Sequence, residues 1–153
     1  MNFIRHFFRR KIKLDGRSQS IPFDHSGQMA FDLSDLYLLA EHNTEYSIQL
    51  LELFLSNAEK GLKQLQIACE LHNWNQASAI AHKLIPGCNQ LHISQLVAIL
   101  QQIEAQTSNK PDALSLKALS NQAMYSFYQV KKMIGAELGK LKELPPPNLA
   151  EGR

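Results

Sequence analysis

The sequence has few cysteines, few glycines and no long hydrophobic run. Its two cysteines, Cys69 and Cys88, form no CxxC pair, which argues against a disulfide scaffold or a paired-cysteine zinc site. Seven glycines and six prolines in 153 residues are too few for a collagen-like or low-complexity chain. No apolar stretch approaches the roughly 18 residues of a membrane span. These absences predict a single globular domain, with the cytoplasm as its default compartment.

Strong charge of one sign is confined to the start of the chain. Residues 1–20 have a net charge of +5, and the remaining residues have −3, which together give +2. The body of the chain therefore does not look like a nucleic-acid-binding surface, and we expect no nucleic-acid partner. Residues 1–13 place apolar and basic residues on opposite helical faces, a pattern typical of weak membrane-surface or partner contact. A plain tail is the alternative.

From residue 31 onward the apolar residues recur with a helical period. A short helix is expected after Asp32 or Ser34, and Asn43 or Thr44 is expected to cap a long second helix. A third helix should end at Pro86-Gly87, and Ser94 is a plausible N-cap for the fourth. The last helix should begin near Pro111 and stop at residues 145–147, which are all proline.

This pattern predicts an all-α protein, an antiparallel four-helix bundle (up-down-up-down) with a short extra N-terminal helix. Residues 15–30 mix Gly, Ser, Pro and Asp without a period, as loops do. The predicted organisation is a basic N-terminal tail and linker at 1–30, the bundle at 31–143, and a Pro-rich C-terminal tail at 144–153.

Local enzyme motifs are missing. The sequence contains no GxxxxGK[ST], GxGxxG, GxSxG or HExxH, and no repeated ExxH, so nucleotide, dinucleotide, hydrolase, zinc and di-iron sites have no support. We expect no cofactor and no metal bound by this chain. A metal held by His82 and His92 is disfavoured, because the predicted break at Pro86-Gly87 separates them and no carboxylate lies in register.

Among the six histidines, His82 differs from the others in its position. His6 and His25 lie in the tail and loop, and His42 and His72 lie near helix ends. Ala77, Ala81 and their neighbours are expected to face the core, which puts His82 in mid-helix on an exposed flank. There a neutral imidazole nitrogen can act as a nucleophile, and Lys83 beside it can neutralise an incoming anion.

The residues around His82 resemble the histidine-containing phosphotransfer (HPt) domain. Such domains typically read A-H-x-L-K-G, then a Leu-Gly pair, then a helix closing in Leu-Glu. The resemblance covers about residues 31–140, and no single piece of it is specific. The matching segments are Phe31-Asp32-Leu33-Ser34-Asp35-Leu36, Leu53-Phe54-Leu55, His72-Asn73-Trp74, Ala81-His82-Lys83-Leu84, Leu91, Leu96 and Ile103-Glu104.

The resemblance implies a phosphorelay intermediate without kinase or ATPase activity of its own. His82 would accept a phosphoryl group from the aspartyl phosphate of a response-regulator receiver domain, or of a hybrid histidine kinase, and pass it to another receiver. Mg²⁺ would be supplied by the receiver. The sequence departs from the family pattern at three positions: Ile85 replaces the usual Lys, Pro86 the Gly, and His92 the Gly of the Leu-Gly pair.

Pro86 should bend the helix, since its ring crowds the carbonyl of His82 and it lacks an N–H. The candidates for contact with a partner are Ser78, Ile85, Pro86, Cys88 and Asn89, although Ile85 and Cys88 are equally consistent with the core.

Two other functions remain open. A histidine-kinase dimerisation hairpin also carries a histidine followed by proline, but it has an acid where Lys83 stands, and it dimerises. A catalytically inert helical scaffold is the second, in which His82 has no chemistry. The phosphocarrier is expected to be a monomer.

Overall fold

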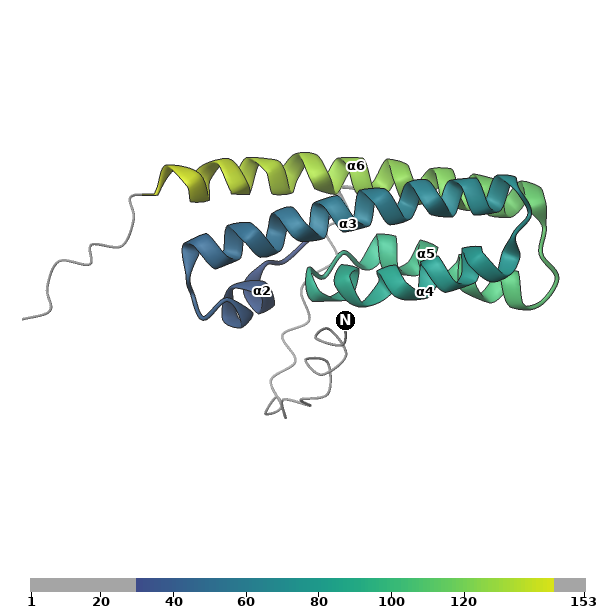
Figure 1. The fold of residues 1–153 in the computed structure, drawn as a ribbon, viewed down its shortest axis with the longest axis horizontal. Coiled ribbons are helices and arrows are strands. Elements are labelled where there is room, and N and C mark those ends of the chain that lie inside the picture. Colours follow the sequence, from purple (N-terminus) through teal and green to yellow (C-terminus); the bar gives the residue numbers. More distant parts are fainter. Residues whose placement is uncertain (1–29, 145–153) are drawn as a thin grey trace, which may run out of the picture.

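The computed structural model describes residues 30–144, and all regular secondary structure within them is helical (Figure 1). The helices are α2 (Ser34–Leu39), α3 (Thr44–Glu70), α4 (Trp74–Gln90), α5 (Ser94–Ser108) and α6 (Ala113–Glu143). The predicted all-α bundle with a short N-terminal helix is confirmed. No helix between residues 30 and 144 is long and apolar enough to cross a membrane. The predictions for residues 1–13 lie outside the described residues.

The four long helices pack around a single core. Short turns at 71–73, 91–93 and 109–112 reverse the chain between them. α3 packs against α4 and α6, and α5 packs against the same two helices. Each helix therefore has two neighbours, and α4 and α5 form the layer opposite α3 and α6.

The layers differ in length. α3 has 27 residues and α6 has 31, whereas α4 has 17 and α5 has 15. At 1.5 Å per residue the long layer extends beyond the short one by about 15 Å or more. α2 lies beside the first turns of α3 at this end (Figure 1), and it buries Leu36 while the flanking Leu33 and Ala40 are also buried. α2 thus completes the short layer.

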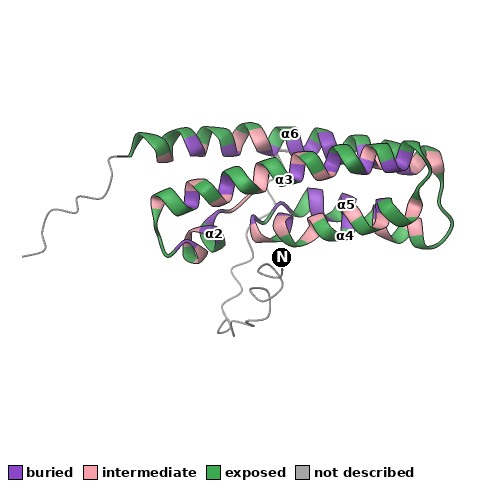
Figure 2. Cartoon of the chain, in the orientation of Figure 1, coloured by how far each residue is buried: buried purple, intermediate pink, exposed green. Residues whose placement is uncertain are grey.

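The core is apolar from end to end. Figure 2 shows buried positions on the helix faces that turn toward one another and exposed positions outside. Of the described residues, only Ser47, Ser120 and Ser126 are polar and buried, and their hydroxyls leave no buried atom without a hydrogen-bond partner. The largest fully buried side chains are Phe127, Leu51, Leu62, Leu65, Leu91, Ile93, Leu96, Leu100, Ile103, Leu116, Ile134 and Val130.

Asn and Asp cap three of the long helices. The Asn43 side chain accepts from the backbone N–H of Tyr46, and Asn73 caps α4 and Asp112 caps α6 in the same way, satisfying N–H groups that have no partner within the helix. The prediction that Ser94 caps α5 is wrong. Ile93 holds that position without a side-chain bond, and Ser94 is the first residue of the helix.

The predicted end of the third helix at Pro86-Gly87 is also wrong, because α4 continues through Pro86 to Gln90. A proline removes one backbone hydrogen bond, to the carbonyl four residues earlier. The next turn is held instead by packing: Cys88 is buried, and the α-carbon of Gly87 lies so close to Phe54 that an added Cβ would sit 3.4 Å from its ring. Proline inside the helix therefore does not separate His82 from the turn at His92.

Candidate functional site

Packing of α4 against its neighbours fixes the rotation that exposes His82. Ala77 and Ala81 are fully buried, and their small side chains let the neighbouring helices approach. On the α3 side Leu84 fills the space left by Gly61, where an added Cβ would lie 2.8 Å from Leu84 Cδ2. Since adjacent helical residues differ by about 100°, a buried Ala81 places His82 on the outer flank. The side chain of His82 is 76% exposed, as predicted.

A carboxylate from the neighbouring helix holds the His82 ring. Nδ1 of His82 lies 2.7 Å from Oε1 of Glu104, which is on α5, 22 residues away in the chain. An ionised carboxylate can only accept hydrogen bonds, so Nδ1 is the nitrogen that carries the proton. In the neutral ring Nε2 then has the free lone pair, on the exposed side chain. This arrangement presents one defined nucleophilic atom to the solvent.

Lys83 is the cation next to this nucleophile. It is exposed, and it has no ion-pair partner among residues 30–144. Ile85, one turn after His82, is half-buried and packs against the core, and Pro86 is exposed. The two positions where the family pattern has Lys and Gly therefore contribute apolar surface and no charge.

The predicted contact residues divide into three groups. Pro86 and Asn89 are exposed, and Ser78 and Ile85 are half-buried. Cys88 was predicted at the rim and lies instead in the core, with 1% of its surface exposed. Burial raises the pKa of its thiol to about 12, so the thiol stays protonated at neutral pH and is not a nucleophile.

Three other histidines occupy turns. His42, His72 and His92 each have a φ between 53° and 57° and lie inside the connections at 40–43, 71–73 and 91–93 between consecutive helices. A left-handed backbone there costs least for glycine. This explains the glycine that the family pattern has at the position of His92. In this protein the position has a side chain that makes a contact which glycine could not make. Nε2 of His92 lies 2.8 Å from Oδ2 of Asp35 and connects the turn to α2.

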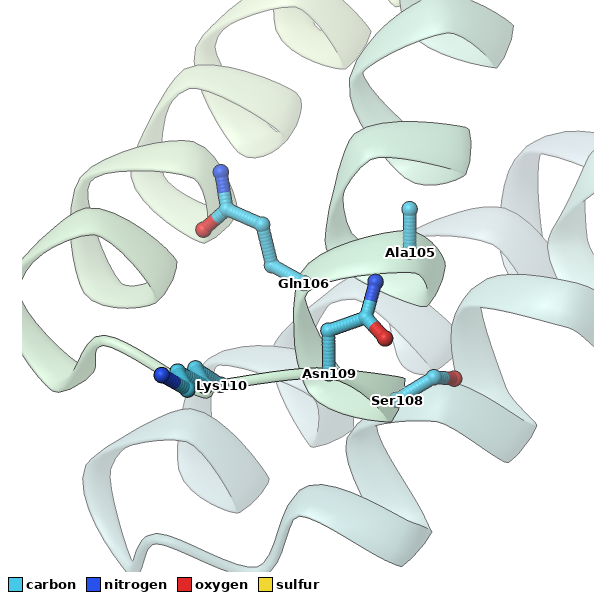
Figure 3. Close-up of a pocket in the computed structure, with 5 residues that line it drawn as sticks. All are labelled: Ala105, Gln106, Ser108, Asn109 and Lys110. Atoms are coloured by element: carbon cyan, nitrogen blue, oxygen red, sulfur yellow. The ribbon is translucent and has the colours of Figure 1, made fainter.

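Neither a metal-ligand cluster nor the surface depression at the C-terminal end of α5 overlaps this site. Within residues 30–144 no three His, Cys, Asp or Glu side chains come together as metal ligands would. Figure 3 shows the depression at the C-terminal end of α5, where Gln106 accepts a hydrogen bond from Ser115. His82 does not line this depression, so the depression is not the candidate reaction centre. Its lining residues are Ala105, Gln106, Ser108, Asn109 and Lys110.

Comparison with known families agrees with the geometry. The model of the Hpt domain matches residues 49–137, which include His82 and Glu104. The chain belongs to the Hpt domain family. No curated protein and no solved structure gives a significant match.

Membership gives this Hpt domain a general role in phosphorelay signalling. Hpt domains are histidine phosphotransfer carriers, not kinases or ATPases, and they interact with receiver domains of response regulators or hybrid kinases. Sequence reasoning singled out His82 and missed its contact with Glu104, which entered only as part of a motif. The available signal was its place as the one acid of α5.

Proposed function

We propose that His82 accepts a phosphoryl group from the aspartyl phosphate of a receiver domain and transfers it to a second receiver. The Nε2 lone pair attacks phosphorus in line, a P–N bond forms, and the P–O bond to the aspartyl group breaks to release the carboxylate. Transfer to the second receiver reverses these bond changes. The observation that carries the proposal is the exposed His82 ring with Nδ1 bound by Glu104, in a chain of the Hpt family.

Glu104 assists by position and by charge. As Nε2 bonds to phosphorus the imidazole ring becomes cationic, and its Nδ1 proton points at the Glu104 carboxylate 2.7 Å away. A fixed negative charge at that distance favours the developing cation and keeps the ring oriented. The Nδ1 proton can then pass to the carboxylate or to solvent. Lys83 carries the opposite charge and neutralises phosphoryl oxygens at the surface.

The remaining properties of this carrier are also proposals. We expect it to have no kinase or ATPase activity, and to rely on the Mg²⁺ of the receiver domain. We expect a monomer, because the four long helices bury a common apolar core between them. We also expect the carrier to reside in the cytoplasm. Weak membrane-surface contact through residues 1–13 would be an addition to this function.

Labelling by phosphorylated receiver domains of the same organism, with Mg²⁺ present, tests the proposal. Wild-type protein should acquire acid-labile, base-stable phosphohistidine, and His82→Gln should acquire none. Because His82 is exposed, the substitution should change the free energy of unfolding by less than about 0.5 kcal/mol. His42→Gln is the matched control, since His42 is also exposed but lies in a turn, and it should be labelled normally.

Three results would contradict the proposal. Undiminished labelling of His82→Gln would move the phosphoacceptor to another residue. Absence of labelling by every receiver would favour the inert scaffold, and dimerisation of the full chain would favour the histidine-kinase hairpin.

A further inference from the structure

Charged residues are nearly absent from the layer that carries His82. α3 contains six charged residues and α6 contains seven, whereas α4 contains only Lys83 and α5 only Glu104. Glu104 is hydrogen-bonded to the His82 ring, and its negative charge is opposite to that of Lys83, so the charged side chains of the two helices sum to zero. We define the α4–α5 face as the exposed residues of these two helices. They are Asn75, Gln76, Ala79, His82, Lys83, Pro86, Asn89, Ser94, Gln95, Ala98, Gln101, Gln102, Ala105 and Ser108.

This face consists mainly of uncharged side chains: amides, alanines, serines and one proline, with no exposed Phe, Tyr or Trp. Side-chain amides offer both donors and acceptors, and the alanines and the proline add apolar area without long side chains to immobilise. Depletion of charged residues is the compositional signature of the buried part of protein interfaces. Apart from Lys83 and Glu104, charge borders this face at its two ends, in the pair of Asp35 with His92 and in Lys110.

We propose that the α4–α5 face binds a receiver domain whose own contact surface is uncharged, so that association proceeds without electrostatic steering. This inference rests on the proposed function and specifies its partner. A charged receiver surface would lose its hydration against amides and alanines that supply no counter-charge, which is unfavourable. An uncharged surface has no such cost, and it selects against receivers that use ion pairs.

Two consequences separate this binding mode from a steered one. Steered association is faster by about 10 to 10³-fold and slows sharply with salt. Here the charges at the site are those of Lys83, Glu104 and the phosphoryl group, and Lys83 and Glu104 are opposite in sign, so the transfer rate constant should change by less than about threefold between 50 and 500 mM salt. A charge added to the face should slow transfer whichever its sign. A charged partner surface would instead respond oppositely to the two signs.

The test uses exposed alanines, which avoid the loss of any existing contact. Ala79→Glu, Ala79→Lys, Ala105→Glu and Ala105→Lys add charge to α4 and α5, and Ala118→Glu and Ala118→Lys do so on α6 as matched controls. Transfer is measured from the phosphorylated receiver that labels the wild type. Each rate is divided by the rate of labelling with phosphoramidate, a small donor that needs no docking and thus corrects for effects on His82 itself.

The expected result is a loss of about tenfold or more in all four α4–α5 variants, with no loss in the Ala118 controls. A steep salt dependence, a response that depends on the sign of the charge, or unchanged rates in all four variants would each overturn this inference while leaving His82 as phosphoacceptor. Labelling of His82 by no receiver would overturn the proposed function, and this inference with it.

Discussion

Glu104 holds the exposed imidazole of His82 in one orientation. A surface imidazole in water samples both tautomers and many ring orientations, and either nitrogen can be the nucleophile. The 2.7 Å contact with the Glu104 carboxylate selects the tautomer protonated on Nδ1. Glu104 therefore acts as a positioning residue, and its contribution should depend on both its hydrogen bond and its charge.

Replacement of Glu104 separates these two effects. Glu104→Gln keeps an oxygen that can accept from Nδ1 but removes the negative charge, while Glu104→Ala removes both. We expect phosphotransfer to slow by about tenfold in Glu104→Ala, equivalent to about 1.4 kcal/mol, and by less in Glu104→Gln. Rapid-quench measurement of the transfer rate constant tests this. Gln122→Ala, an exposed position on α6 outside the α4–α5 face, is the control, and equal rates in all variants would leave Glu104 without a role.

At the scale of elements, the turns between helices determine where α2 and α4 sit. The turn at 91–93 bonds once to the segment just before α2, where the backbone N–H of Asp32 donates to the carbonyl of Leu91, and once to α2 itself, through His92 and Asp35. Ser34 holds the start of α2, since its hydroxyl and N–H donate to Asp32 and lower the pKa of that carboxyl. α2 is thus attached to α4 and α5 by polar contacts and to α3 by apolar ones.

Substitutions at His92 test the cost of its left-handed backbone. His92→Ala and His92→Gly both lose the exposed pair with Asp35, but only glycine adopts a φ of 53° without strain. His92→Gly should therefore be more stable than His92→Ala by about 1 kcal/mol. Urea unfolding of the two variants measures this difference. If alanine proved as stable as glycine, the turn in solution would not be left-handed.

For the whole molecule, polar contacts along the α3–α6 seam reinforce the apolar core. Lys131 and Lys63 donate to Glu59 and hold the pKa of its carboxyl at about 2, well below its usual value of 4.5. Lys142 bonds to Glu52, and Gln66 to Asn121, further along the same seam. These contacts lie on the layer opposite His82, so they stabilise the bundle without charging its α4–α5 face.

The depressed pKa of Glu59 makes part of the stability dependent on pH. A carboxyl whose folded pKa lies below its unfolded pKa stabilises the fold above the unfolded value and loses this contribution as pH falls through the folded value. Wild type should therefore be more stable than Glu59→Gln at pH 7, and the difference should shrink between pH 4.5 and pH 2. Urea unfolding at several pH values checks it. Glu70→Gln serves as the control, and a difference independent of pH would contradict the mechanism.

The basic N-terminal segment should be separable from the bundle. The core of the described residues is complete between Leu33 and Leu138. Deletion of residues 1–27 should therefore leave the helix content unchanged by circular dichroism and shift Tm by less than about 2 °C. A fall of about 10 °C or more would show that Phe3, Phe7 and Phe8 belong to the core.

The sequence by itself determined the helices and the position of His82. Helical periodicity and capping residues such as Asn43 are local properties, and a buried Ala81 necessarily turns His82 outward. Prediction from the sequence failed where packing between distant residues outweighs a local rule. Pro86 weakens a helix, yet α4 continues because Cys88 and Gly87 pack beyond it, and the same packing takes Cys88 away from the rim.

Only the tertiary structure decided the chemistry at His82. Glu104 is 22 residues away, and its contact with Nδ1 exists because the turn at 91–93 brings α5 back along α4. Periodicity assigns a residue to a face of its own helix, but it does not fix how two helices are rotated and shifted against each other. That register depends on the summed packing of the core, which no local pattern contains.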